Sequence, residues 1–219
     1  MNMESKVYKF EHKRIPFLGY RIYLPDGYSA EKSYPLIIAL HGAGERGEDT
    51  SLVEVHGVAK YVAAGLKLDA IVIAPQCPSD WVWSNLTVEL KELIDSVVSE
   101  YSVDTDRISL TGLSMGGFGT WEMGISYPAF FSALAPVCGG GMSWRAKLIG
   151  STPVWAFHGD ADTVVPPENS HMMVKALRAA GGNVKLTIFG GVGHNSWVNA
   201  YEDTRVIEWL LEQRRQVEQ

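Results

Sequence analysis

A serine, a histidine and two aspartates stand at positions from which they could carry out acyl transfer. Ser114 is the centre of the pentapeptide GLSMG (112–116), which lies between an apolar run and a segment of helical character. A serine hydroxyl is a weak nucleophile, so it needs a base, and the base needs a carboxylate to orient it. His194, in the glycine-rich stretch GVGHNSW (191–197), fits the base, and HGDADTVVP (158–166) supplies the aspartates.

The two aspartates differ in how far into their loop they lie. Asp162 lies deeper, just before VVP, and is expected to reach across to His194. Asp160 is expected to form a turn, because a carboxylate at such a position binds nearby backbone amides. The order Ser114, Asp162, His194 is the one expected when the serine sits on a sharp turn from a strand into a helix.

The remaining histidines are assigned no catalytic role. His41 ends an apolar run and is expected to shape the loop beside the site, and His158 is expected to pack or to brace its own loop. No supporting constellation surrounds His12, His56 or His171 in the sequence.

Acyl transfer also needs backbone amides that stabilise the oxyanion of the tetrahedral intermediate, each worth about 3–4 kcal/mol in a dry site. One is expected from the residue after the nucleophile, Met115, and the other from the loop after the third strand. That loop reads LHGAGERG (40–47), in which two glycines allow the backbone to approach a substrate closely. We therefore expect the second amide to be that of Ala43.

Short β-rich runs alternate with longer helical segments, which is typical of a mostly parallel sheet covered on both faces. Strands are expected at 6–10, 20–24, 35–40, 70–75, 107–112, 131–137, 153–159 and 185–190, and helices at 86–101, 118–127, 167–180 and 196–214. The first two strands, joined by IPFLG, are expected to pair antiparallel. The later ones are nearly continuous in aliphatic residues, as strands buried on both faces are.

The composition is that of an ordinary globular protein, with 46% hydrophobic and 20% charged residues among 219. One catalytic domain is expected over residues 1–219. The net charge of −6 leaves no basic surface for phosphates, so neither nucleic acid nor a membrane is expected as a partner. The start, MNMESKVYKFEHKR, lacks the features of a signal peptide. As written, the chain is expected to be cytoplasmic, or secreted if a leader was trimmed.

Four motifs in order, LHGAGERG, GLSMGG, HGDADTVVP and GHNSW, resemble the α/β-hydrolase superfamily. Within it they are similar to the phospholipase/carboxylesterase group and its dienelactone-hydrolase-like and "predicted peptidase" relatives. The resemblance implies a three-layer α/β sandwich with a mostly parallel eight-stranded sheet, and a carboxylic ester hydrolase without metal or other cofactor. It assigns Ser114 as nucleophile, Asp162 as acid, His194 as base, and the amides of Ala43 and Met115 to the oxyanion hole. Dienelactone hydrolases carry Cys at the nucleophile, which argues against that activity.

In this fold Cys77 and Cys138 follow strands that lie three strand spacings apart, about 14 Å. This separation exceeds the reach of a disulfide, so both thiols are expected to be reduced. The segment 138–152, after the sixth strand, is too short for the large lid that lipases of this fold carry there. We therefore expect an open site that acts on soluble, short-chain esters.

Trp83 and Trp197 are expected to line the pocket, and Gln76 to add a polar contact to the substrate or to be structural. Aromatic walls suit a sugar ring or an aryl group such as feruloyl, so the expected substrate is a small-molecule or oligosaccharide ester, acetylated xylan included. The alternatives are a prolyl-oligopeptidase-like serine peptidase, an acyl-protein thioesterase and, least favoured because all three catalytic residue types are present, a non-catalytic binding protein. The sequence sets no expectation for the oligomeric state.

Overall fold

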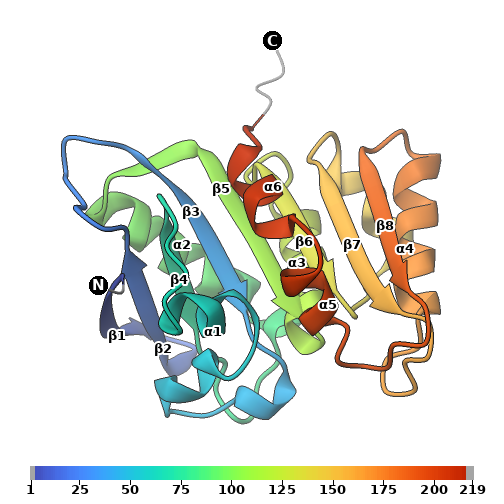
Figure 1. The fold of residues 1–219 in the computed structure, drawn as a ribbon, viewed down its shortest axis with the longest axis horizontal. Coiled ribbons are helices and arrows are strands. Elements are labelled where there is room, and N and C mark those ends of the chain that lie inside the picture. Colours follow the sequence, from blue (N-terminus) through green and yellow to red (C-terminus); the bar gives the residue numbers. More distant parts are fainter. Residues whose placement is uncertain (1–2, 216–219) are drawn as a thin grey trace.

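One eight-stranded sheet forms the middle layer of the molecule in the computed structural model, which describes residues 3–215 apart from the Pro16 side chain (Figure 1). The strands are β1 (Glu4–His12), β2 (Ile15–Leu24), β3 (Tyr34–Leu40), β4 (Ile71–Pro75), β5 (Val103–Leu113), β6 (Ala133–Val137), β7 (Val154–Gly159) and β8 (Val184–Phe189). Their order across the sheet is β1-β2-β4-β3-β5-β6-β7-β8. β2 pairs antiparallel with β1 and β4, and every other pair is parallel. The predicted sheet and the antiparallel pairing of its first two strands are confirmed. The expected link IPFLG is instead the first half of β2, and the turn between β1 and β2 lies at residues 13–14.

Helices cover both faces of the sheet (Figure 1). On one face lie α2 (Thr87–Glu100), α3 (Met115–Ser126) and α4 (Glu168–Ala179), and on the other lie α1 (Gly57–Ala63), α5 (Trp197–Glu202) and α6 (Val206–Glu212). Each face has its own apolar core, because successive residues of a strand point to opposite sides. In β3, for example, Leu36 and Ile38 belong to the core under α2 and α3, and Ile37 to the core under α1 and α6. The predicted three-layer α/β sandwich is confirmed.

Two helix predictions need correction. The single helix expected over 196–214 is two short helices, α5 and α6, separated at residues 203–205. The hydroxyl of Thr204 donates to the Ala200 carbonyl of the first helix and accepts from the Val206 amide of the second, so it ends one helix and caps the other. Helix α1 was not expected, although Val58, Ala59 and Val62 form its buried face at helical spacing.

Short 3-10 helices occupy several loops: η1 (Ala43–Glu45), η2 (Thr50–Glu54), η3 (Trp83–Asn85) and η4 (Ser143–Ile149). The segment 138–152 contains η4 and no other helix, so the prediction that a large lid is absent is confirmed. Cys77 and Cys138 are both buried and unpaired, as expected from their separation in the sheet. Burial raises the pKa of each thiol to about 12.

Parallel strands bring four loops to one edge of the sheet. The loops after β3, β5, β7 and β8 all leave from the carboxyl ends of their strands, at the bottom of Figure 1. Within 3–215 no helix is long and apolar enough to cross a bilayer. Residues 1–2 and 216–219, which the expected domain of 1–219 includes, lie outside the described residues.

Candidate active site

Ser114 lies at the sharp turn between β5 and α3. Its backbone has φ 52° and ψ −117°, a conformation that is strained for a residue with a side chain. The turn closes only because two neighbours are glycines. A Cβ on Gly112 would lie 2.4 Å from the Gly116 carbonyl oxygen, and one on Gly116 would lie 2.3 Å from that of Leu40. The strain therefore lifts the Ser114 hydroxyl from the sheet edge.

The structure brings the expected serine, histidine and aspartate into one hydrogen-bonded chain. His194 Nε2 lies 2.9 Å from Ser114 Oγ, and His194 Nδ1 lies 2.7 Å from Asp162 Oδ2. Nδ1 must donate to the carboxylate, which leaves Nε2 free to accept the serine proton. This geometry is that of a nucleophile whose base is oriented by a buried acid.

Asp162 is held from several sides. Its Oδ1 accepts from the amides of Val164 and Val165, both at 2.9 Å. Burial alone would raise the pKa of this carboxyl, but the hydrogen bonds from His194 and from the two amides outweigh it and hold the pKa below its usual value. The acid is therefore ionised wherever the histidine could act as a base.

Asp160 lies outside this chain. Its Oδ1 accepts from the Gly191 amide at 2.6 Å, which ties the loop after β7 to the loop after β8. The carboxylate is exposed and serves the turn rather than the base.

The two expected oxyanion amides start helices on either side of Ser114. Met115 is the first residue of α3 and Ala43 the first of η1, so neither amide has a partner within its own helix. The two loops touch, because a Cβ on Gly42 would lie 3.7 Å from Ser114 Cβ. Both amides therefore belong to segments that adjoin Ser114, and their role in an oxyanion hole stays a prediction.

His41 braces the loop that carries Ala43. Its Nε2 accepts from the Cys77 amide at 2.9 Å, so its Nδ1 carries the proton and donates to the Gly42 carbonyl at 2.6 Å. Burial is the main cause that lowers the pKa of this imidazole to about 4. His41 is therefore a neutral structural link between the loops after β3 and β4.

Trp83 does not line a pocket. Its side chain is 0% exposed and packs in the core under α3, and its Nε1 donates to the His41 carbonyl at 3.0 Å. Gly119 of α3 allows this close packing, since a Cβ there would lie 2.5 Å from Trp83 Cβ. The expectation for Trp83 was wrong because η3, which carries it, packs against α3 and places the indole in the core.

Gln76 is also structural. It is buried, and its amide nitrogen donates to the carbonyls of Glu45 and Asp49 at 2.9 and 2.8 Å. Both N–H groups of the Gln76 side-chain amide donate to the loop after β3, so the side chain holds that loop in place. Of the two roles considered for Gln76, the structure supports bracing.

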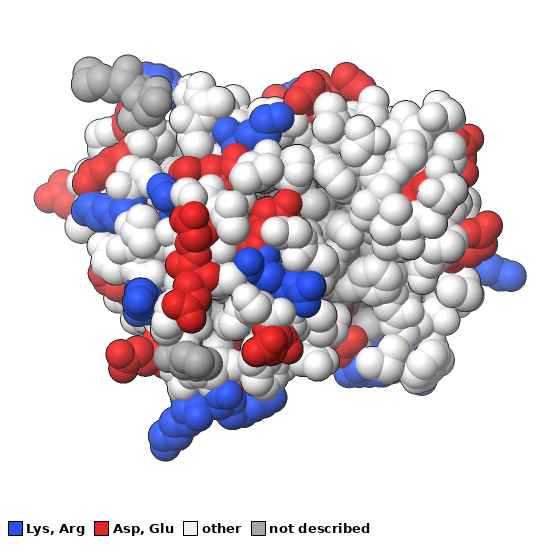
Figure 2. Space-filling view, turned by 90° about the horizontal axis from the view of Figure 1, so that it is seen from below, with Lys and Arg blue, Asp and Glu red and all other residues white. Residues whose placement is uncertain are grey.

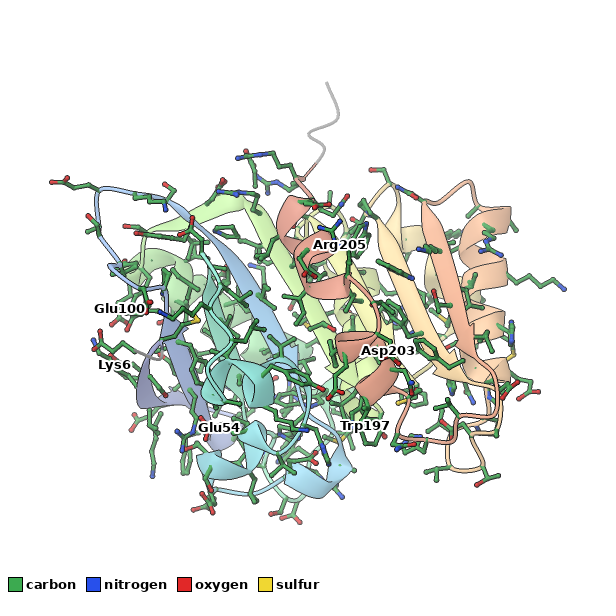
Figure 3. All side chains as sticks on the ribbon, in the orientation of Figure 1. Lys6, Glu54, Glu100, Trp197, Asp203 and Arg205 are labelled. Carbon is green, nitrogen blue, oxygen red and sulfur yellow. The ribbon has the colours of Figure 1, made fainter. Side chains whose placement is uncertain are left out.

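Trp197 stands at the edge of the site, at the start of α5 (Figure 3). Its ring meets that of His194 edge to face, with centroids 5.5 Å apart, and also contacts the ring of His56 at 5.2 Å. Its side chain is partly exposed, and its contact with a substrate stays a prediction. The place of His56 beside Trp197 could not be predicted from the sequence, because the two residues come from distant segments.

A second histidine touches the acid. His158 Nε2 lies 3.2 Å from Asp162 Oδ2 and 2.8 Å from the Val165 carbonyl, and Nδ1 lies 2.7 Å from Ser170 Oγ. Nε2 faces two acceptors, so it must carry a proton. The expected bracing role of His158 therefore extends to the acid itself.

Cys138, Asp162 and His194 bring a sulfur, an oxygen and a nitrogen within 4.8 Å of one another. A metal ion would need the thiolate, and burial raises the pKa of this thiol to about 12. His194 Nδ1 is already bound to Asp162. The donor set thus fits the hydrogen-bonded chain better than a metal site.

Charged side chains are unevenly distributed over the face that carries the site. Figure 2 looks onto the sheet edge from below and shows charged side chains gathered on the left, towards β1, β2 and α1, and few on the right, towards β7, β8 and α4. Exposed apolar side chains on the elements of that right half include Trp144 at 74%, Val164 and Met172. A substrate thus meets one polar and one largely uncharged flank.

Comparison with known proteins shows the family and the fold. The Phospholipase/Carboxylesterase family matches residues 69–207, more than half of the chain. The chain belongs to this family. Its fold is also that of a solved thermostable esterase, with a TM-score of 0.85 and 35% identity over 96% of this chain and 63% of that one.

Two further sequences extend the comparison. "Poly(3-hydroxyalkanoate) depolymerase C" of Paucimonas lemoignei is 28% identical over 133 residues, which cover 54% of this chain and 30% of that protein. "Probable feruloyl esterase C" of Aspergillus oryzae is 27% identical over 187 residues, 82% of this chain and 68% of that protein. The chain spans less than a third of the depolymerase and less than two thirds of the thermostable esterase.

Proposed function

We propose that this family member is a serine carboxylesterase that hydrolyses carboxylic esters through an acyl-enzyme on Ser114. The observation that carries the proposal is the chain from Ser114 Oγ through His194 to Asp162 Oδ2, at 2.9 and 2.7 Å, on a strained turn. The names of the relatives support ester hydrolysis in general.

In the first half of the reaction, Ser114 Oγ attacks the ester carbonyl while its proton passes to His194 Nε2. The carbonyl oxygen becomes an oxyanion that accepts hydrogen bonds from the amides of Ala43 and Met115. When the intermediate collapses, the bond to the alcohol oxygen breaks and His194 gives that oxygen its proton. The alcohol leaves and the acyl group stays on Ser114.

In the second half, water takes the place of the alcohol. His194 Nε2 accepts a proton from the water as its oxygen attacks the acyl carbonyl, and the same two amides stabilise the second oxyanion. Collapse returns the proton to Ser114 and releases the acid. Asp162 keeps its negative charge throughout and stabilises the imidazolium that forms in each half.

The surroundings of the site favour small or polar esters. The segment 138–152 leaves the site without a large cover, so no interfacial opening is needed. The uncharged flank suits a short acyl or an aryl group, and the name of the Aspergillus relative makes feruloyl esters a natural test. We therefore propose short-chain, carbohydrate or aryl esters as substrates.

A fluorophosphonate probe and a panel of esters test the proposal. We expect the wild-type protein to be labelled, and Ser114→Ala to lose labelling and to lower kcat/KM for p-nitrophenyl acetate by about 10⁴-fold or more. Ser99→Ala, on the exposed face of α2, is the matched control and should behave as wild type.

Two results would contradict the proposal. One is labelling or turnover that survives in Ser114→Ala. The other is an activity that rises steeply from p-nitrophenyl acetate towards long-chain triglyceride emulsions, which would refute the open, short-chain site.

A further inference from the structure

A buried carboxylate of the oxyanion loop has no use in the mechanism above. The side chain of Glu45 is 10% exposed, and its Oε2 is buried without a hydrogen-bond partner among the described residues. It lies beside the nucleophile, because a Cβ on Gly42 would lie 3.2 Å from Glu45 Oε2 and 3.7 Å from Ser114 Cβ. Burying a carboxylate without full hydrogen bonding is costly, so its presence at this place needs a reason.

The other oxygen of Glu45 faces a ring nitrogen of His56 without forming a hydrogen bond to it. Oε1 lies 3.7 Å from His56 Nε2, too far for a hydrogen bond. An oxygen atom beside the pair, about 2 Å off the line that joins the two atoms in a position called the gap below, would lie about 2.8 Å from both, the usual hydrogen-bond distance. The His56 side chain is 36% exposed, so the gap can be entered from outside.

The gap adjoins the catalytic histidine. His56 contacts the ring of Trp197, and Trp197 contacts the ring of His194. Glu45, His56 and Trp197 thus form one continuous wall from the oxyanion loop to the base. They come from η1, from the residue before α1 and from α5, so only the fold brings them together.

We propose that Glu45 and His56 form a subsite for a hydroxyl group on the alcohol portion of the ester, as in a glycerol or sugar ester. The proposal rests on the esterase function proposed above and names its substrate class. The departing oxygen must lie within reach of His194 Nε2, so the alcohol portion lies against the wall that Trp197 begins. A second hydroxyl on that alcohol then reaches the gap.

The chemistry of the two groups selects a hydroxyl. Glu45 only accepts a hydrogen bond when ionised, and the His56 Nε2–H donates one. A hydroxyl does both at once, donating to Glu45 and accepting from His56. An ammonium group could not accept from His56, and a carboxylate would be repelled by Glu45.

A pair of esters that differ only in hydroxyl groups tests the subsite. We compare kcat/KM for glycerol 1-monoacetate with that for propyl acetate. The wild-type protein should prefer the glycerol ester about tenfold, because its hydroxyl gains hydrogen bonds to Glu45 and His56 that propyl acetate cannot form. Two variants each remove one half of the subsite: Glu45→Leu removes the acceptor, and His56→Phe removes the donor but keeps a ring against Trp197.

Each variant should lower kcat/KM for glycerol monoacetate about tenfold and leave the value for propyl acetate within about twofold. The control is Glu48→Gln, an exposed carboxylate of the same loop, which should keep the wild-type preference. His56→Phe keeps the test valid if Glu45→Leu fails to fold.

If the two variants lost the same factor in kcat/KM on both esters, Glu45 and His56 would only hold the loop, and the proposal would be overturned. The same follows if the wild-type protein shows no preference, since the gap would then hold only water. If the wild-type protein hydrolysed neither of these esters nor p-nitrophenyl acetate, the proposed esterase function would be refuted, and the proposed subsite with it.

Discussion

His158 Nε2 lies 3.2 Å from Asp162 Oδ2, the same carboxylate oxygen that accepts from His194 at 2.7 Å. The His158 Nε2–H is shared between this oxygen and the Val165 carbonyl. The backbone amide of Val165 in turn donates to Asp162 Oδ1. His158 is fully buried, and burial lowers its pKa, so it acts as a neutral donor. The acid is thus fixed from two sides, by the catalytic histidine and by this one.

Replacing His158 tests this positioning role. In His158→Phe the ring remains but the donor is lost, so we expect kcat to fall about tenfold, the cost of one hydrogen bond to a charged group, with KM unchanged. His158→Gln, whose amide can donate, should recover part of the loss. The measurement is steady-state kinetics with p-nitrophenyl acetate.

The control is His171→Phe, an exposed position on α4. If His158→Phe changed KM and kcat alike, or if the glutamine variant recovered nothing, the histidine would be a packing residue and not a support for the acid.

Because of His41, the free energy of unfolding should decrease as the pH falls below 6.5. Burial is the largest cause that lowers its pKa, from 6.5 to about 4, so the unfolded chain binds a proton at a pH where the folded protein does not. The contribution of His41 to the free energy of unfolding is therefore fully present above pH 6.5 and is lost as the pH falls towards 4. Between these two pH limits the free energy of unfolding changes by about 3 kcal/mol on account of this one group.

Urea unfolding of wild type and His41→Gln between pH 4 and 7 measures this contribution. The variant should be less stable at pH 7, because the Cys77 amide and the Gly42 carbonyl lose a common partner. Its stability should fall less steeply towards pH 4. Parallel curves for the two proteins would mean that His41 is not the group that titrates.

Most of the fold and of the catalytic chain could be predicted from local patterns. The eight strands follow from apolar runs, and Ser114, Asp162 and His194 each lie in a short motif just after a strand. Parallel strands bring such positions to one edge, so order along the chain suffices to bring these residues together.

The rest depends on contacts that no local pattern contains. Trp83 was expected in the pocket, but its burial follows from the path of the chain after β4 and from its bond to His41, 42 residues away. The proximity of Glu45 and His56 could not be predicted either, because they belong to separate segments, η1 and the residue before α1. The break between α5 and α6 follows from Thr204, whose hydroxyl serves both helices.

Gly116 should be indispensable for reasons of space. An alanine Cβ would lie 2.3 Å from the Leu40 carbonyl oxygen and 2.8 Å from that of His41, and both atoms belong to backbone that cannot yield cheaply. We expect Gly116→Ala to destabilise the protein by about 3 kcal/mol or more and to abolish activity. Gly44→Ala is the matched control for stability, because a Cβ there meets nothing within 4 Å. Equal melting temperatures for the two variants would contradict the prediction.

The two tryptophans that were expected to line the pocket should now behave differently. Trp83→Phe removes a core indole and the donor to the His41 carbonyl, so we expect a loss of about 2 kcal/mol of unfolding free energy, with KM unchanged. Trp197→Ala removes a partly exposed wall ring and should raise KM for methyl ferulate or glycosyl acetates severalfold, with little loss of stability.

Trp197→Phe separates substrate contact from support of the base. It keeps an aromatic face beside His194, so kcat should stay near the wild-type value and KM should lie between those of wild type and Trp197→Ala. A fall in kcat alone, with KM constant in both Trp197 variants, would show that the ring orients His194 and does not touch the substrate. A raised KM in Trp83→Phe would mean that the buried indole shapes the pocket through the His41 loop.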